Sequence, residues 1–403
     1  MPLRVLSSAL AALTVLTCYS TGQQTAPQSA PVVRQSPDPS GLTIESFGSA
    51  NAYAVGTQLV TFVATIRNTG RNPVPAGLFT ARISCLAGLE YTEGDTRPRL
   101  PELAPNAAVT FKWSLRPSAP DLPLVASVAL ESPGVIPDAR VAAVQHFADT
   151  IPSESAGFSK QAAARGSRSG ATLENANVRL RIYSSEATIP ALLLSARTAT
   201  GWRRVGTSLP AAEVFSADGG QRPWGELFRV DSINASATTT DATLRITGRF
   251  GLRWRGTLFL SLRTDSSVVD ARLQLVPLKP VKLSGIRLCP LLAGEGSFGA
   301  LTTESMAPEA FGTGTICALR WGVVTTGAAW PDSPNLDGWK SSPLLNPEGA
   351  DYRLIGAEWR PEGQPSNLNS GNVIELRTRL FAFTPSATIN DARKVAPPAR
   401  TAP

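Results

Sequence analysis

From Gly41 onward the chain is a succession of short segments in which apolar and polar residues alternate, separated by turns rich in Pro, Gly and Asn. No segment between them places apolar residues at the 3.6-residue spacing of an amphipathic helix. Because successive side chains of a β-strand point to opposite faces, the alternation indicates half-buried strands. The sequence therefore predicts an all-β protein made of antiparallel β-sandwiches.

The first group of strands spans residues 41–148. Six strands are expected, at residues 42–47, 59–66, 79–85, 109–115, 124–130 and 139–147. Asn68 and Gly70 follow the second strand and suit a tight turn. Several short strands at this spacing predict a sandwich of about 100 residues with an immunoglobulin-like architecture.

Two passages of this group carry a family resemblance. The segment 60–70 is an alternating strand followed by Asn68-Thr69-Gly70, and the segment 100–113 reads Leu-x-x-Leu-x-Pro before a strand that contains Trp113. Together they resemble CARDB-type bacterial immunoglobulin-like domains over about residues 41–148. Such domains act mostly as spacers or adhesion modules, so the resemblance implies little chemistry.

A second and larger β region is expected at residues 171–392, after a basic linker at 149–170. Its strands are expected at residues 173–182, 244–255, 258–263, 268–276, 318–324 and 373–383. This much antiparallel structure can form one large sandwich or two small ones.

The larger region resembles the galactose-mutarotase-like supersandwich of carbohydrate-active proteins. The resemblance rests on the opening Leu173-Glu174-Asn175, on the Trp after a turn in residues 201–205, and on the meander 244–276 that continues into 291–298. Catalytic mutarotases use histidines with a glutamate, and the one histidine of this chain, His146, lies outside the region. The resemblance thus implies the fold, while mutarotase chemistry is excluded.

The N-terminus has the layout of a secretory signal peptide, expected at residues 1–22. A basic start is followed by the apolar run Val5–Leu16, which is shorter than the ~20 residues that span a bilayer. A flexible tether is expected at 23–40 and a disordered tail at 393–403. These segments predict a secreted or periplasmic protein with no stable membrane span. The alternative is a lipoprotein with the lipid on Cys18, although Thr17 departs from the small residue that the bacterial lipobox has at this position.

Three cysteines lie beyond the signal peptide: Cys85, Cys289 and Cys317. In an oxidising compartment two can pair, and Cys289 with Cys317 is the favoured bridge because both lie in the larger region. The alternative is that all three are small buried apolar residues. No pair has metal-site spacing and there is a single histidine, so no metal, cofactor or Ser-His-Asp triad is expected.

The formal net charge is +7, carried by 32 Arg and 6 Lys, and the isoelectric point is near 9.5. Either a GC-rich coding bias or an anionic partner explains this balance. Nucleic acid is not expected for an exported protein. Within the expected strand 244–255 one face carries Thr247 and four arginines: Arg245, Arg249, Arg253 and Arg255. Such a row can hold carboxylates or sulfates, or it is a solvated sheet face.

Aromatic and acidic residues gather in the expected loops of the larger region. The candidate ligand-binding residues are Trp224, Glu226, Trp330, Asp332, Asp337 and Trp339. Indole rings stack on the apolar face of sugars, and neighbouring carboxylates bind the hydroxyl groups, so this set points to carbohydrate binding. The alternative is that the indoles cap the core beneath the loops.

These patterns lead to a non-catalytic protein that binds a polysaccharide or cell-envelope glycan. A polysaccharide lyase with Tyr183 or Tyr352 as base, or a glycosidase with two of the loop carboxylates, is the enzymatic alternative. A purely structural envelope protein is the third possibility.

Overall fold

The computed structural model describes residues 41–92, 94–118, 123–134, 136–147, 159–167, 170–183, 189–217, 224–293, 303–311, 313–321, 323–350, 352–384 and 389–395. All of these belong to one compact unit, Asp38–Pro403. The expected signal peptide, the tether up to residue 40 and Cys18 lie outside the described residues. So does the expected tail, apart from residues 393–395.

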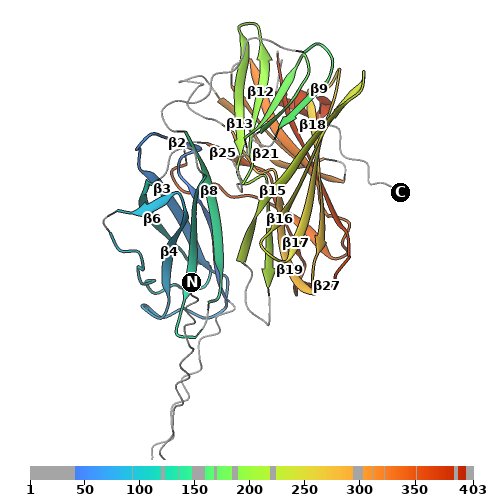
Figure 1. Cartoon of the computed structure of the whole chain (residues 1–403). Coiled ribbons are helices and arrows are strands. Elements are labelled where there is room, and N and C mark those ends of the chain that lie inside the picture. The colour runs from blue at the N-terminus through green and yellow to red at the C-terminus, as the bar shows by residue number, and fades with distance from the viewer. Residues whose placement is uncertain are drawn as a thin grey trace, which may run out of the picture. The chain divides into compact units, whose positions relative to one another are not determined.

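Residues 42–147 form a sandwich of two four-stranded sheets, the N-terminal sandwich (Figure 1). One sheet has the order β1 (Leu42–Ser49), β3 (Val60–Asn68), β6 (Ala108–Pro117), β5 (Leu89–Tyr91). The other has the order β2 (Tyr53–Val55), β8 (Ala139–Phe147), β7 (Leu124–Glu131), β4 (Thr80–Ala87). All pairings are antiparallel except β2 with β8. The six expected strands are present, and the alternation did not indicate the three-residue strands β2 and β5.

Asn68 holds the turn that the sequence indicates after β3. Its side chain is fully buried; Oδ1 accepts a hydrogen bond from the backbone N–H of Gly70, and Nδ2 donates to the carbonyls of Asn72 and Leu103, each at 2.9 Å. A Cβ at Gly41 would lie 2.7 Å from Gly70 Cα, so the chain can close this corner only with glycine. The polar turn is therefore satisfied internally at the edge of the apolar core.

The larger region is one sandwich of two sheets, here called the large sandwich. Its smaller sheet has the order β25 (Arg353–Ile355), β20 (Leu291–Ala293), β13 (Gly201–Ser208), β12 (Ala191–Thr198), β11 (Val178–Tyr183), β10 (Gly170–Glu174), β9 (Ala163–Ser167). One continuous apolar core lies between the two sheets and includes Trp254 and Trp359, which settles the alternative between one sandwich and two in favour of one.

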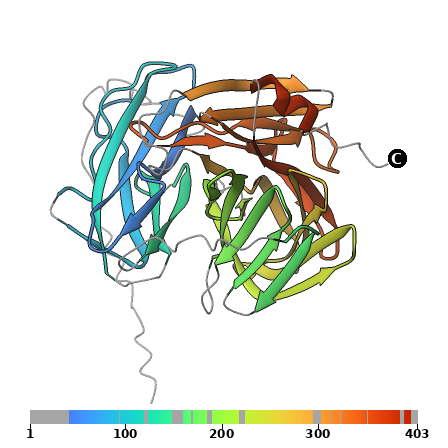
Figure 2. The same ribbon diagram turned by 90° about the horizontal axis from the view of Figure 1, so that it is seen from above.

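The other sheet has thirteen strands and runs β21 (Thr303–Phe311), β22 (Gly314–Trp321), β23 (Val324–Pro331), β28 (Ile374–Phe383), β18 (Val268–Pro277), β17 (Trp254–Arg263), β16 (Asp241–Phe250), β15 (Trp224–Ala237), β14 (Ala212–Ala217), β19 (Val281–Leu288), β26 (Ala357–Pro361), β24 (Trp339–Pro343). The thirteenth strand, β27 (Ser366–Leu368), pairs with β19. In Figure 2 the green strands of the smaller sheet lie against the yellow strands of this one. A short 3-10 helix (η3, Ile389–Asp391) leads into α1 (Ala392–Val395), and no helix among the described residues could cross a membrane.

Several boundaries differ from the expected ones. The expected strand 173–182 is the hairpin β10–β11, whose turn is held by Asn175 Oδ1 accepting from the N–H groups of Asn177 and Val178. The expected strand 244–255 is also two strands, because the chain turns at Gly251, whose φ is +52°. Part of the expected linker is strand β9, and residues 393–395 of the expected tail belong to α1.

Strand β14 is buried along its whole length because both of its faces are covered. Val214 points into the core of the large sandwich. On the opposite face Phe215 lies under the guanidinium of Arg140 from β8, with 4.8 Å from Cζ to the ring centroid. Glu213 of β14 shares this second face, and its Oε2 lies 3.1 Å from Arg287 Nη1.

Candidate anion-binding face

The tryptophans expected to stack on sugars are core residues. Trp330 is 3% exposed and Trp339 is 2% exposed, and both belong to the apolar core of the large sandwich. The indole N–H of Trp339 donates to Ser366 Oγ at 2.8 Å. Neither ring presents a face to solvent, so the prediction that Trp330 and Trp339 stack on a sugar is wrong. The physical reason is that β23 and β24 turn these large rings inward, where burial of the rings stabilises the fold.

The carboxylates of the expected site do not converge with those rings. Asp332 and Asp337 lie exposed between β23 and β24, and Asp332 Oδ1 accepts a 3.3 Å hydrogen bond from Thr315. Glu226 lies on β15 and lines a pocket to which Trp330, Asp332, Asp337 and Trp339 do not contribute. Trp224 begins β15, and its side chain lies outside the described part of the structure.

The expected Cys289–Cys317 disulfide is not formed. Cys289 is a buried free cysteine at the end of β19, and Cys317 packs partly buried on β22 against the same core. Burial raises the pKa of the Cys289 thiol well above its ordinary value and that of Cys317 to about 11. Both side chains therefore serve as small apolar residues, as the alternative interpretation held.

We predict that alkylation of the native protein under non-reducing conditions leaves Cys289 unmodified, because its sulfur is enclosed by the core. Partly exposed Cys85 is expected to react first. Peptide mass spectrometry before and after unfolding in denaturant measures this. A Cys289–Cys317 cross-linked peptide from the unreduced protein would contradict the structure.

Two side chains that could act as catalytic bases, those of His146 and Tyr352, are buried and contact backbone carbonyl oxygens instead. His146, the one histidine of the chain, is buried on β8, and its Nε2 lies 2.8 Å from the carbonyl oxygen of Gly56. Tyr352 is buried and donates its hydroxyl hydrogen to the carbonyl of Ser49 at 2.7 Å. Among the described residues no group of three or more His, Cys, Asp and Glu could hold a metal ion.

Arginine side chains dominate the solvent-facing side of β15, β16, β17, β18 and β28, which we call the arginine face. Alternate residues of these strands, such as Leu244 and Leu273, are fully buried, which leaves the residues between them facing outward. The outward ionisable residues are Arg229, Arg245, Arg249, Arg255, Arg263, Arg272, Arg377 and Arg379, with Asp231, Asp241, Asp270 and Glu375. Eight cations against four carboxylates give the face an excess of positive charge.

The register concentrates this charge in one row. Arg249 on β16 lies directly opposite Arg229 on β15 and Arg255 on β17. We call these three residues the arginine row. The row has one carboxylate, Asp231, whose Oδ1 is 3.1 Å from Arg249 Nη2. Like charges placed directly opposite across a sheet are destabilising, so the row favours a bound anion.

The rest of the face is more nearly neutral. Glu375 pairs with Arg377 at 2.7 Å and with Arg272 at 3.7 Å, and Asp270 pairs with Arg379 at 2.7 Å. Partial burial opposes ionisation of Glu375, but hydrogen bonds from Gln274 and Arg377 and the charge of Arg272 lower its pKa overall. Within the described part of the chain no carboxylate pairs with Arg229, Arg245 or Arg255. These arginines are the ones available to a ligand.

Sequence reasoning identified part of this face. Arg245, Arg249 and Arg255 share a face as expected, but Arg255 does so because the chain reverses at Gly251. Arg253, which was expected on the same face, lies in that turn and is half-buried, and its neighbour Leu252 is 85% exposed. Arg229 was missed, since its strand has a bulge between Val230 and Ser232 that breaks the alternation.

Two comparisons with known proteins give no relative. No family model matches the chain, and no curated protein matches it. The candidate site therefore stands on its geometry.

Proposed function

We propose that this protein is an exported, non-catalytic binder of an anionic cell-envelope polysaccharide, held on the arginine face. The observation that supports it is the arginine row, where three guanidinium groups on neighbouring strands face one carboxylate. Guanidinium groups bind carboxylates and sulfates through paired hydrogen bonds. Export rests on the signal-like N-terminus, and the resemblance to CARDB-type and supersandwich domains agrees with a binding role.

The shape of the face suits an extended polymer better than a compact substrate. Adjacent strands are about 4.8 Å apart, so the cationic row across β15, β16 and β17 forms a line rather than a closed cavity. A short row of hydroxyl groups runs beside it across the same strands, where Ser232, Thr247 and Thr257 lie in register. Hydroxyl and guanidinium groups together can bind the alcohols and acids of a uronate or sulfated chain.

The test replaces Arg245, Arg249 and Arg255 with glutamine in one variant. Each exposed charge contact contributes roughly 0.5 kcal/mol, so the affinity for a polyuronate should fall by about tenfold. Titration calorimetry with polygalacturonate measures the affinity, with dextran as the neutral polymer. Wild-type binding should also weaken as salt rises, because exposed charges are screened.

The matched control replaces Arg71, Arg97 and Arg116 with glutamine, which removes the same charge from exposed positions of the N-terminal sandwich. It should retain nearly the wild-type affinity if the arginine face is the site. Equal losses in both triple variants would show general charge attraction and overturn the proposal. New ultraviolet absorbance from unsaturated sugar products would instead establish a lyase.

A further inference from the structure

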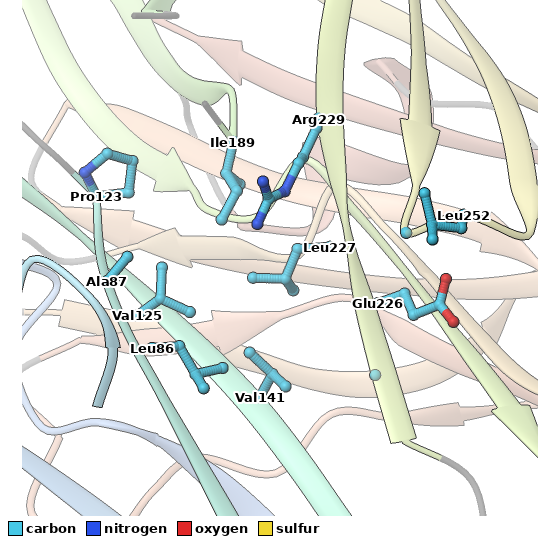
Figure 3. A pocket seen from close by; sticks show the side chains of 12 residues that line it. Leu86, Ala87, Pro123, Val125, Val141, Ile189, Glu226, Leu227, Arg229 and Leu252 are labelled. Atoms are coloured by element: carbon cyan, nitrogen blue, oxygen red, sulfur yellow. The ribbon is translucent and has the colours of Figure 1, made fainter. Parts of the chain in front are cut away.

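A second binding feature adjoins the arginine row. A pocket of about 550 Å³ lies between the N-terminal sandwich and the start of β15 (Figure 3). Its apolar lining comprises Leu86, Val125, Val141, Ile189, Leu227 and Leu252. This volume is within the usual range of small-ligand sites, about 300–1,000 Å³.

The rim of the pocket leaves large apolar side chains in water. Leu86, near the end of β4, is 55% exposed, and Leu252, in the β16–β17 turn, is 85% exposed. Both leucines therefore expose apolar surface to water at the same opening, and an exposed apolar patch is typical of a ligand-binding site. An apolar ligand that covered both would remove that area from water and so bind favourably.

One cation enters this apolar surrounding. Figure 3 shows the side chain of Arg229 directed between Ile189 and Leu227, among the apolar lining residues. No carboxylate pairs with Arg229 among the described residues. Glu226 also lines the pocket, but its carboxylate packs against the turn, since a Cβ at Gly251 would lie 2.5 Å from Glu226 Oε2. Beside Ile189 and Leu227 the pocket therefore combines apolar walls with the positive charge of Arg229, while the carboxylate of Glu226 lies by Leu252.

We infer that this pocket binds a fatty-acid carboxylate, whose alkyl chain lies against the leucine and valine side chains while Arg229 pairs with its carboxylate. The charge complementarity selects an anion, and the lining selects an alkyl body over a sugar. This ligand is distinct from the polysaccharide proposed above. The inference depends on Arg229 and the pocket, not on Arg245, Arg249 or Arg255.

The experiment measures binding of laurate to the full chain by titration calorimetry below the micelle concentration. Wild-type protein should bind laurate more tightly than decanoate and decanoate more tightly than octanoate, by about fourfold for each methylene group that becomes buried. Dodecylammonium, with the same chain and opposite charge, should bind at least tenfold more weakly than laurate. Arg229→Met should weaken laurate about tenfold and abolish most of that preference.

Two further variants separate the pocket from the rest of the molecule. Leu252→Asp places a negative charge at an exposed position of the rim and should weaken laurate without unfolding the protein, which circular dichroism verifies. Arg116→Met, on the exposed side of β6, should bind laurate as the wild type does. Equal affinity for laurate and dodecylammonium, an unchanged Arg229→Met variant, or no laurate binding would each overturn the inference. Polygalacturonate binding measured on the same samples would then still decide the proposed function independently.

Discussion

Replacing Arg287 with methionine should lower the free energy of unfolding by about 3–5 kcal/mol. Arg287 is the cation between two buried carboxylates: its Nη1 donates to Glu213 at 3.1 Å, and its Nη2 donates to Glu358 at 2.8 Å. The two carboxylate side chains are only 1% and 7% exposed. Burial alone would lower the pKa of Arg287, but Glu358 and Glu213 together raise it. Without this cation the Glu213 carboxyl group loses its ion-pair partner, and buried Glu358 keeps only Arg360 in direct contact among the described residues.

Denaturant unfolding followed by tryptophan fluorescence measures the loss. The matched control is Arg272→Met, which breaks a 3.7 Å pair with Glu375 at a site where the arginine is 39% exposed. That change should cost less than about 1 kcal/mol. Adding Glu213→Gln to Arg287→Met should recover part of the loss, because it removes the buried carboxyl group that has lost its ion-pair partner. A loss below about 1 kcal/mol for Arg287→Met would show that the buried network does not stabilise the fold.

This network also joins the two sandwiches. Arg140, on β8 of the N-terminal sandwich, and Arg287, on β19, lie over the same Phe215 ring, at 4.8 and 4.9 Å from its centroid. Arg140 Nη2 is 3.6 Å from Asp138, whose Oδ2 accepts the backbone N–H of Ile44 at 2.8 Å. The ring, the cations and the carboxylates exclude water together, which strengthens each charge interaction.

The sequence predicted the fold class because apolar and polar residues alternate wherever one face of a strand is buried and the other faces solvent. On β16, Leu244 and Ile246 alternate with Arg245 and Thr247, and the structure places them inward and outward as expected. On β23 the rule fails. Both of its faces are covered, so Thr325 and Thr326 are as buried as Val324, and the exposure of Trp330 could not be inferred from spacing.

The charge arrangements depend on contacts that no local pattern encodes. Arg287 meets Glu213 and Glu358 across 74 and 71 residues of chain. The arginine row depends on the register of three strands, which the turn at Gly251 and the bulge in β15 determine. A register shifted by one residue would turn Arg249 into the core. The amino-acid composition therefore shows how many charges there are, but only the pairing of the strands determines where they lie relative to one another.

Glu213 should make the protein less stable as the pH rises from about 4.5 to about 7. Burial raises the pKa of Glu213 from 4.5 to about 7, against the attraction of Arg287 on β19 and Arg140 on β8; Glu358 on β26 adds to the rise. Because the folded state holds this proton more tightly than the unfolded chain, its stabilising contribution is complete below pH 4.5 and is lost as the pH passes about 7. The loss is about 3 kcal/mol.

Glu358 acts in the opposite direction. Burial would raise its pKa, but Arg287, Arg360 and Arg140 hold it well below the ordinary value, so its contribution is present above pH 4.5 and lost on acidification. Wild-type stability should therefore be greatest near pH 5, and denaturant titrations across the range measure it. Glu213→Gln should remove the decline toward pH 7 and leave the acid side unchanged, while exposed Glu102→Gln should alter neither. If Glu213→Gln keeps the decline, Glu213 is ionised throughout, and the buried network is a fixed set of ion pairs rather than a titrating one.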